Sequence, residues 1–226
     1  MCRKAAPSAA IVRARFLTGR VGGNVGSNLR EVIEGSTAME VYISEDAFWG
    51  LLVSTIEVYK RECFGFLIGY RDTNNIFIVE HALPSQSVKR WNTGVIENKR
   101  SERRIKRFLS NLPPLSLIGD FHSHAGWGDL KGVPIPSDQD VRQMAPNTVY
   151  IIIEVNDKRK SVPWNYNDDG TISGTTDEYY FKIVAYYLDS RQRAKRANIF
   201  CPYAIGFDAK TRSTNLQFGA ARPRSD

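Results

Sequence analysis

The stretch LSLIGDFHSHAGWGDLKGVPIPSDQD, residues 115–140, carries most of the information about the fold and the chemistry of this chain. It opens with apolar residues, places His122 and His124 one residue apart, and continues through a loop to Ser137 and Asp140. The pattern is H-x-H, a loop, then S-x-x-D. Two imidazoles and one carboxylate make a three-ligand set. Such a set is typical of catalytic zinc sites, which keep a fourth position for water, whereas structural zinc sites are usually closed by four protein ligands.

The residues around the two histidines predict how the motif is presented. Residues 115–122 form a mostly apolar run that predicts a buried strand, and side chains two apart on a strand point to the same face. His122 and His124 can therefore reach one metal ion. Residues 125–136 contain three glycines and two prolines, which predicts a loop. Ser137 is then a plausible N-cap of a helix, with Asp140 at the third helical position.

Each part of this pattern also has a simpler interpretation. S-x-x-D at a helix start is most often only a capping arrangement, and a single histidine on a strand is usually a core or surface residue. A metal site is favoured because the parts occur together: the chain has only three histidines, and two of them fall in this motif. Asp120 shares their strand face, so it either hydrogen-bonds to them or faces solvent. The third histidine, His81, is better explained as structural.

The motif resembles that of the JAMM (MPN+) metalloprotease family, in which an upstream glutamate precedes H-x-H, a loop and S-x-x-D. Here the upstream element matches ECFGFLIG, residues 62–69, and the similarity extends from about residue 42 to about residue 188. The resemblance implies a zinc ion bound by His122, His124 and Asp140. It also implies that Glu62 and Ser137 complete the catalytic set.

The resemblance further implies hydrolysis of an amide or isopeptide bond. Glu62 then serves as the proton acceptor and donor, and Ser137 stabilises the oxyanion. The implied substrate is a ubiquitin-like or small sulfur-carrier-like protein with a flexible C-terminal tail. This chain departs from the family in Ala125, where proline is usual, and in the length of the loop 125–136. We expect the longer loop to alter the rim of the cleft more than the metal geometry, since loop closure cost grows slowly with length.

Two alternative functions belong to other classes. One is a non-catalytic MPN scaffold for protein–protein assembly, although this chain keeps every motif residue. The other is a nucleic-acid-associated protein like the RadC branch, which resembles this fold and carries a similar metal motif. Binding to nucleic acid should weaken steeply with added salt.

The net charge of +7 is concentrated in two groups of basic residues. The first lies on or before a predicted helix whose apolar face we expect at Ile105, Phe108, Leu109 and Leu112. Its members are Lys89, Arg90, Lys99, Arg100, Arg103, Arg104, Lys106 and Arg107. The second group contains Arg191, Arg193, Lys195 and Arg196. The usual explanation is a solvated face, and the alternative is a patch for an acidic protein partner or nucleic acid.

Length and composition predict one domain with extensions. The 226 residues are 42% hydrophobic, which is enough for a single core. We expect a flexible basic, Gly-rich extension over residues 1–38, a JAMM/MPN domain over 39–200 and a C-terminal tail over 201–226. No apolar run approaches the 18 residues of a membrane span. Three widely spaced cysteines predict neither a disulfide framework nor a C-x-x-C pair, and favour a reducing, cytoplasmic setting.

The remaining patterns predict an α/β fold with a mixed sheet flanked by helices. Residues 44–60 predict a helix capped by Ser44. Residues 63–70 and 76–83 predict a hairpin, and residues 148–155 predict a buried strand. A last strand is expected at residues 179–188. This order agrees with the cytidine-deaminase-like three-layer JAMM/MPN domain that the resemblance implies.

Overall fold

The computed structural model describes residues 39–72, 76–87, 89–91, 94–96, 99–126 and 131–206. The predicted extension 1–38 lies outside the described residues, and so do residues 207–226 of the predicted tail. In the described part of the chain, no helix combines the length and apolar character needed to span a membrane.

The elements are β1 (Glu40–Ile43), α2 (Glu45–Glu57), β2 (Phe64–Arg71), β3 (Ile76–Pro84), β4 (Lys89–Trp91), β5 (Gly94–Ile96), α3 (Lys99–Leu109), β6 (Ser116–Ala125), α4 (Asp138–Gln143), β7 (Val149–Asp157), β8 (Asn165–Tyr166), β9 (Ile172–Thr176), β10 (Tyr179–Leu188), β11 (Ala194–Phe200) and α5 (Pro202–Ile205).

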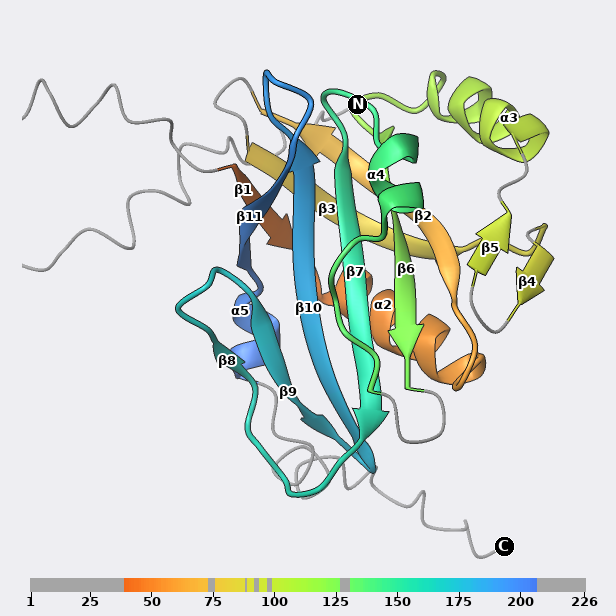
Figure 1. Ribbon diagram of the computed structural model, residues 1–226. Coiled ribbons are helices and arrows are strands. Elements are labelled where there is room, and N and C mark those ends of the chain that lie inside the picture. The colour runs from red at the N-terminus through yellow and green to blue at the C-terminus, as the bar shows by residue number, and fades with distance from the viewer. Residues whose placement is uncertain are drawn as a thin grey trace, which may run out of the picture. The chain divides into compact units, whose positions relative to one another are not determined.

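The main sheet has nine strands in the order β11-β1-β3-β2-β6-β7-β10-β9-β8 (Figure 1). β1 runs parallel to β3 and β11, and β6 runs parallel to β7, whereas the other pairs are antiparallel. The predicted mixed sheet with flanking helices is therefore confirmed. β10 also pairs with β11, so the sheet curls into a barrel-like arrangement. Because of this closure, the expected three-layer sandwich is not clearly present.

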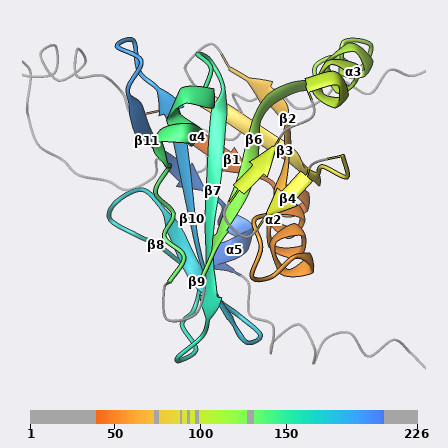
Figure 2. The same ribbon diagram turned by 45° about the vertical axis from the view of Figure 1, so that its right-hand side comes forward.

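The central strand β7 separates two apolar clusters. Val149, Ile151 and Ile153 join the large core that also contains residues of α2 and α5. Tyr150 and Ile152 alternate with them and join a smaller cluster with Met144, the C-cap of α4. This alternation follows from the two-residue period of a strand. It places α2 and α4 on opposite faces of the sheet (Figures 1 and 2).

Helix α2 begins where the sequence predicts it. Ser44 is the N-cap, and its Oγ accepts a hydrogen bond from the Ala47 backbone N at 3.1 Å. Two acidic residues in the first turn favour the positive end of the helix dipole. Phe48 and Leu51 are fully buried, so the apolar stripe of the helix faces the sheet.

The predicted hairpin is present in the structure, whereas the predicted start of the C-terminal tail differs from it. The hairpin of β2 and β3 is confirmed, although residues 73–75 of its connection lie outside the described residues. Beyond β11, Cys201 and Ala204 are fully buried, and Tyr203 Oη accepts a hydrogen bond from Trp49 Nε1 at 3.1 Å. Residues 201–206, which the sequence assigned to a tail, therefore include a short helix packed into the core.

Helix α3 corrects the expected apolar face. Leu109 is buried as predicted, but Phe108 is 65% exposed and Leu112 is 44% exposed. The helix projects at one corner of the molecule (Figures 1 and 2), and its main contact is with β6. Because only one side of the helix is covered, part of the predicted apolar stripe faces solvent.

Candidate metal centre

Strand β6 brings two histidines to the face covered by α4. In the parallel register of β6 and β7, His122 pairs with Ile152 and His124 pairs with Glu154. Ile152 belongs to the smaller cluster, so the histidine side chains lie on that face of the sheet. The two Nε2 atoms are 3.1 Å apart. The prediction that both imidazoles can reach one ion therefore agrees with their geometry.

The first turn of α4 brings a carboxylate to the same place. Ser137 is the N-cap, and its Oγ accepts a hydrogen bond from the Asp140 backbone N at 3.2 Å. The Asp140 Oδ2 atom accepts hydrogen bonds from the Ser137 backbone N at 2.6 Å and from Ser137 Oγ at 2.7 Å. The same Oδ2 lies 3.8 Å from His122 Nε2 and 4.0 Å from His124 Nε2. Asp140 thus caps the helix and also faces both imidazoles.

The three side chains form a set that could hold a metal ion. His122, His124 and Asp140 each offer one ligand atom, and these atoms all lie within 4.8 Å of one another. Ligand atoms about 2.0–2.1 Å from zinc at tetrahedral angles lie roughly 3.3 Å apart, so a small inward movement of the carboxylate is sufficient. Two imidazoles and a carboxylate suit Zn²⁺ and related first-row divalent ions.

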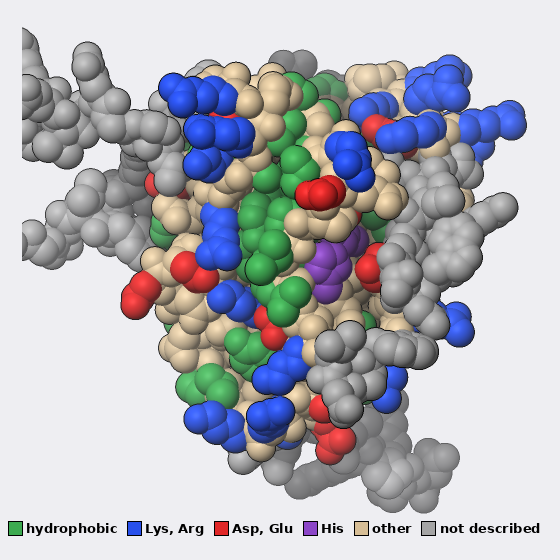
Figure 3. Space-filling model, viewed as in Figure 1, with side chains coloured by type: hydrophobic (Ala, Val, Ile, Leu, Met, Phe, Trp, Pro, Cys, Tyr) green, Lys and Arg blue, Asp and Glu red, His purple; other side chains and the backbone are tan. Residues whose placement is uncertain are grey.

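The electrostatics of His122 also suit a metal ligand. Burial and the neighbouring charge of His124 lower the pKa of His122 to about 4, against the opposing effect of Asp140. The imidazole is therefore neutral at pH 7, as metal binding requires. Histidine side chains reach the surface of this face close to acidic side chains (Figure 3).

The pairing of β2 with β6 explains how Glu62 approaches a motif far along the chain. Phe64 pairs with His122 in the antiparallel register. One step further, the Cys63 backbone N donates a hydrogen bond to Ser123 Oγ at 2.9 Å, and the Cys63 carbonyl accepts one from the Ser123 N at 3.2 Å. Glu62 directly precedes Cys63, and the charge of Asp140 acts on its carboxyl group, so Glu62 lies near the candidate metal ligands.

The ionisation of Glu62 reflects its place beside the metal ligands. Burial raises the pKa of Glu62 to about 7, and the negative charge of Asp140 contributes to the rise. A carboxyl group with a pKa near neutrality can both accept and return a proton. The catalytic roles expected for Glu62 and Ser137 stay predictions.

Sequence reasoning missed Ser123, which lies between the two histidines. It is fully buried and ties the segment of Glu62 to the H-x-H strand. Its only signal in the sequence is that it is a polar residue inside an apolar strand.

Two other residues singled out in the sequence lie outside the donor set. Asp120 is half-buried. His81 lies outside the donor set, with Nδ1 4.0 Å from Asp46 Oδ2.

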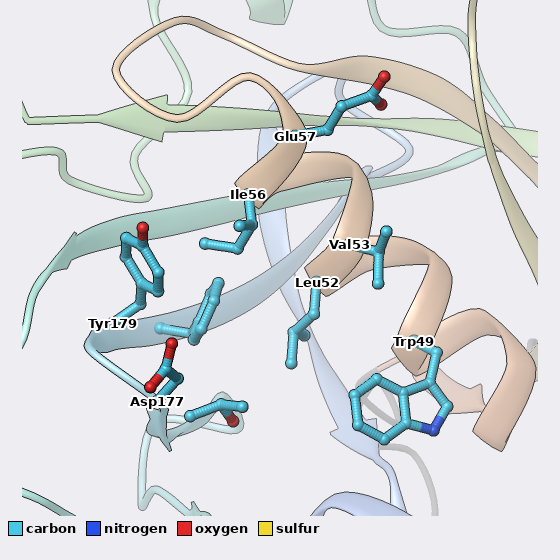
Figure 4. Close-up of a pocket in the computed structure, with 9 residues that line it drawn as sticks. Trp49, Leu52, Val53, Ile56, Glu57, Asp177 and Tyr179 are labelled. Atoms are coloured by element: carbon cyan, nitrogen blue, oxygen red, sulfur yellow. The ribbon is translucent and has the colours of Figure 1, made fainter.

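A hollow lies against α2, on residues that do not belong to the donor set (Figure 4). Its lining consists of Trp49, Leu52, Val53, Ile56, Glu57, Thr176, Asp177, Tyr179 and Phe181. This lining is mostly apolar and contains neither histidine nor cysteine, and Glu57 points away from the hollow. It therefore offers no donor set comparable with that of the metal centre.

A family profile that matches the chain agrees with the motif. The profile of the Prok-JAB family, prokaryotic homologs of the JAB domain, matches residues 50–166, just over half of the chain. No curated protein matches the sequence. The solution structure of protein DSY2949 from Desulfitobacterium hafniense, a structural-genomics target, is similar with 18% identity and a TM-score of 0.48. The match covers 71% of this chain and 92% of that chain.

Proposed function

Because the chain belongs to the Prok-JAB family of prokaryotic JAB-domain homologs, we propose that it is a zinc-dependent metallopeptidase that hydrolyses isopeptide or peptide bonds. The observation that carries this proposal is the convergence of His122, His124 and Asp140 within 4.8 Å. The approach of Glu62 to the same place supports it. A purely structural capping arrangement at α4 does not account for the two imidazoles that face the cap.

The side chains of the centre have distinct roles in the proposed reaction. His122, His124 and Asp140 would hold the zinc ion, which would supply a Lewis acid for activating water and polarising a carbonyl group. Glu62 accepts the proton of the attacking water and returns it to the leaving amine, since its pKa of about 7 permits both transfers. Ser137 Oγ donates to Asp140 Oδ2 at 2.7 Å in the centre without substrate, and in the proposed reaction its hydroxyl turns from that carboxylate to donate a hydrogen bond to the developing oxyanion.

The proposed substrate is the flexible C-terminal tail of a ubiquitin-like or small sulfur-carrier-like protein. His124 and Asp140 are half-buried, so an extended tail reaches them more readily than a folded segment does. A cytoplasmic setting is part of the proposal, and the wide spacing of the three cysteines in the sequence supports it. The proposal also includes a curled form of the cytidine-deaminase-like three-layer arrangement, with the sheet between α2 and α4.

The test is cleavage of ubiquitin-like fusion proteins by the purified chain. We expect cleavage with zinc, loss of cleavage with a chelator, and recovery when zinc is added back. Glu62→Gln should lower kcat by about 10²- to 10⁴-fold without loss of zinc. Glu57→Gln is a matched control, because Glu57 is exposed at the end of α2 and does not belong to the donor set. Cleavage that is indifferent to both the chelator and Glu62→Gln would discard the mechanism.

The non-catalytic scaffold remains the alternative within the family. It makes a different prediction for metal content and turnover. A protein expressed in metal-replete medium that carries no zinc, and that binds ubiquitin-like proteins without cleaving them, would favour the scaffold. The retention of the whole donor set is what places the peptidase first.

The exposed face of α3 supports a further role in binding an acidic protein partner. Arg100, Arg103, Arg104 and Arg107 follow the spacing i, i+3, i+4, i+7, so they form one stripe, and all four are exposed. Glu102 pairs with Lys106 and Lys99 on another side of the helix. The exposed Phe108 lies beside the stripe. Arginine together with aromatic residues is typical of protein–protein interfaces.

A charge reversal tests the role of α3. The double variant Arg104→Glu, Arg107→Glu should weaken binding of an acidic ubiquitin-like protein while leaving zinc binding unchanged. Arg159→Glu with Lys160→Glu, at two exposed positions in the connection after β7, is a control with the same change in charge. Binding of single- or double-stranded nucleic acid with a steep dependence on salt would favour the RadC-like alternative.

A further inference from the structure

Residues 132–134, which we call the strap, contact the second metal ligand from outside the donor set. The Val133 carbonyl O lies 2.6 Å from His124 Nδ1. A carbonyl can only accept, so Nδ1 carries the proton and donates a hydrogen bond to the Val133 carbonyl. The lone pair of the ring is then on Nε2, the atom that faces His122 Nε2 at 3.1 Å. A bonded ring N–H of this kind fixes both the tautomer and the orientation of a metal-ligating histidine.

The strap is anchored on its N-terminal side by Asn156 of β7. The Asn156 Oδ1 accepts a hydrogen bond from the Gly132 N at 3.1 Å, and its Nδ2 donates to the Gly132 carbonyl at 3.3 Å. The same Nδ2 lies 2.7 Å from Glu154 Oε1, which orients the amide. One side chain therefore satisfies both backbone groups of a loop residue, which is a strong constraint on the backbone there.

The strap is anchored on its other side by Tyr186 of β10. The Tyr186 hydroxyl donates a hydrogen bond to the Pro134 carbonyl at 2.8 Å. Tyr186 is 5% exposed and belongs to the smaller cluster, so its ring is fixed by packing. Val133 is thus held between two anchors that come from different strands.

Close packing against the backbone of β6 leaves the strap little room to move. A Cβ atom on Gly132 would lie 2.1 Å from the His124 carbonyl O, so the strap backbone lies directly against the strand backbone at the ligand. The side chains of Val133 and Ile135 are 53% and 58% exposed. Polar contacts from Asn156 and Tyr186, rather than apolar burial, therefore hold the strap in place.

We propose that Asn156 and Tyr186 are positioning residues for the metal ligand His124, acting through the strap. In this arrangement, residues 132–134 are a fixed wall of the metal centre. The proposal rests on the metal site proposed above, but it concerns metal binding and is tested without the hydrolytic reaction.

The test compares the metal-binding properties of Asn156→Ala and Tyr186→Phe with those of the wild type. Zinc affinity is measured by competition with a chromophoric chelator, and ligand geometry is measured from the visible absorption of the Co²⁺-loaded protein. We expect a zinc Kd raised by about 10- to 100-fold for Asn156→Ala, by about 3- to 10-fold for Tyr186→Phe, and altered Co²⁺ bands for both. Tyr187→Phe, the same change at the next position of β10, and Asn165→Ala, at an exposed asparagine, should leave both readouts unchanged.

The outcomes separate this proposal from the proposed function. Tyr186→Phe removes one hydroxyl and keeps the ring that packs in the smaller cluster, so it remains informative if Asn156→Ala fails to fold. Wild-type zinc affinity and Co²⁺ bands in Tyr186→Phe, and in a folded Asn156→Ala, would overturn the positioning role while leaving the peptidase proposal intact. A wild-type protein that binds neither ion would overturn both.

Discussion

Asp140 and Asp169 are carboxylates with similar local partners and different surroundings. Each accepts a hydrogen bond from a hydroxyl close in the sequence, Ser137 Oγ at 2.7 Å and Thr171 Oγ1 at 2.5 Å. Asp169 also contacts a lysine of β10 at 3.1 Å and an arginine of β11 at 3.2 Å. Asp140 instead faces two imidazoles at 3.8 and 4.0 Å.

The pKa values of Asp169 and of the groups around Asp140 reflect the different surroundings of the two carboxylates. Burial alone would raise the pKa of Asp169, but hydrogen bonds from Thr171 and Lys182 and the charge of Lys182 outweigh it and lower the pKa. Around Asp140, the pKa of His122 is lowered to about 4 and that of Glu62 is raised to about 7. The protein supplies its own countercharge at Asp169. At Asp140 it gathers two imidazoles, of which that of His122 has a lowered pKa, and a second carboxyl group, an arrangement that a bound cation stabilises.

The largest difference between the two aspartates should appear in metal affinity. Asp140→Asn removes a charged ligand and should weaken zinc binding by at least about 100-fold, since loss of an outer partner alone costs about 10- to 100-fold. Asp169→Asn makes the same chemical change and should alter the zinc Kd by less than about twofold. Isothermal titration calorimetry of both variants measures the difference. Equal affinities of the two variants for zinc would contradict the assignment of Asp140 as a zinc ligand.

The second difference concerns stabilisation by zinc. Zinc at about 100 times its Kd should raise the free energy of unfolding of the wild type by about 2.7 kcal/mol, because it binds the folded state. Asp169→Asn should show the same gain, and Asp140→Asn should show almost none. Thermal unfolding with zinc and then with excess chelator measures the effect. Zinc stabilisation that survives in Asp140→Asn would place the metal elsewhere.

The third prediction uses two opposing titrations in protein kept in chelator. Folding lowers the pKa of His122 from 6.5 to about 4, so its contribution to stability is complete above pH 6.5 and is lost as the pH falls through 4. Folding raises the pKa of Glu62 from 4.5 to about 7, so its contribution is complete below pH 4.5 and is lost as the pH rises through 7. The two contributions oppose each other in the wild type.

Glu62→Gln should therefore expose the contribution of His122. Between pH 4.5 and 6.5, the unfolding free energy of this variant should rise with pH by on the order of 1–3 kcal/mol more than that of the wild type. Urea unfolding at a series of pH values measures the change. A pH dependence identical to that of the wild type would show that Glu62 titrates normally, away from Asp140.

The smallest effect should be the loss of the charge network at Asp169. Asp169→Asn should lower the free energy of unfolding by about 0.5–1 kcal/mol, since exposed ion pairs contribute little. The loss should shrink in high salt, because salt screens exposed charges. Urea unfolding at low and high salt measures both values. A loss that is independent of salt would assign the effect to the hydrogen bond from Thr171 instead.

The parts of the centre that the sequence predicted are those with short-range causes. His122 and His124 share a face because a strand repeats every two residues, whichever strands pair with it. Ser137 and Asp140 meet because a capping box spans four residues. The cap of α2 at Ser44 has the same local origin. In each case the interacting residues lie within a few positions of one another, so the sequence pattern is enough to predict their local geometry.

Other parts depend on which distant segments pair. From the residues alone, nothing distinguished Glu62, and only the family resemblance indicated it. The structure brings its segment to the site through the contact of Cys63 with Ser123, 60 residues away in sequence. Asn156 and Tyr186 belong to no motif and reach the strap from two strands. The exposure of Phe108 likewise follows from how much of α3 the rest of the chain covers.

The sequence by itself determined the identity of the candidate metal-binding side chains, their local geometry and the mixed character of the sheet. Tertiary structure alone decided the curl of the sheet, the position of Glu62 and the anchoring of the loop beside His124. The physical reason is one of range. Strand periodicity and helix capping are set by neighbouring residues, whereas strand register, sheet closure and pKa shifts arise from contacts between residues far apart in the chain.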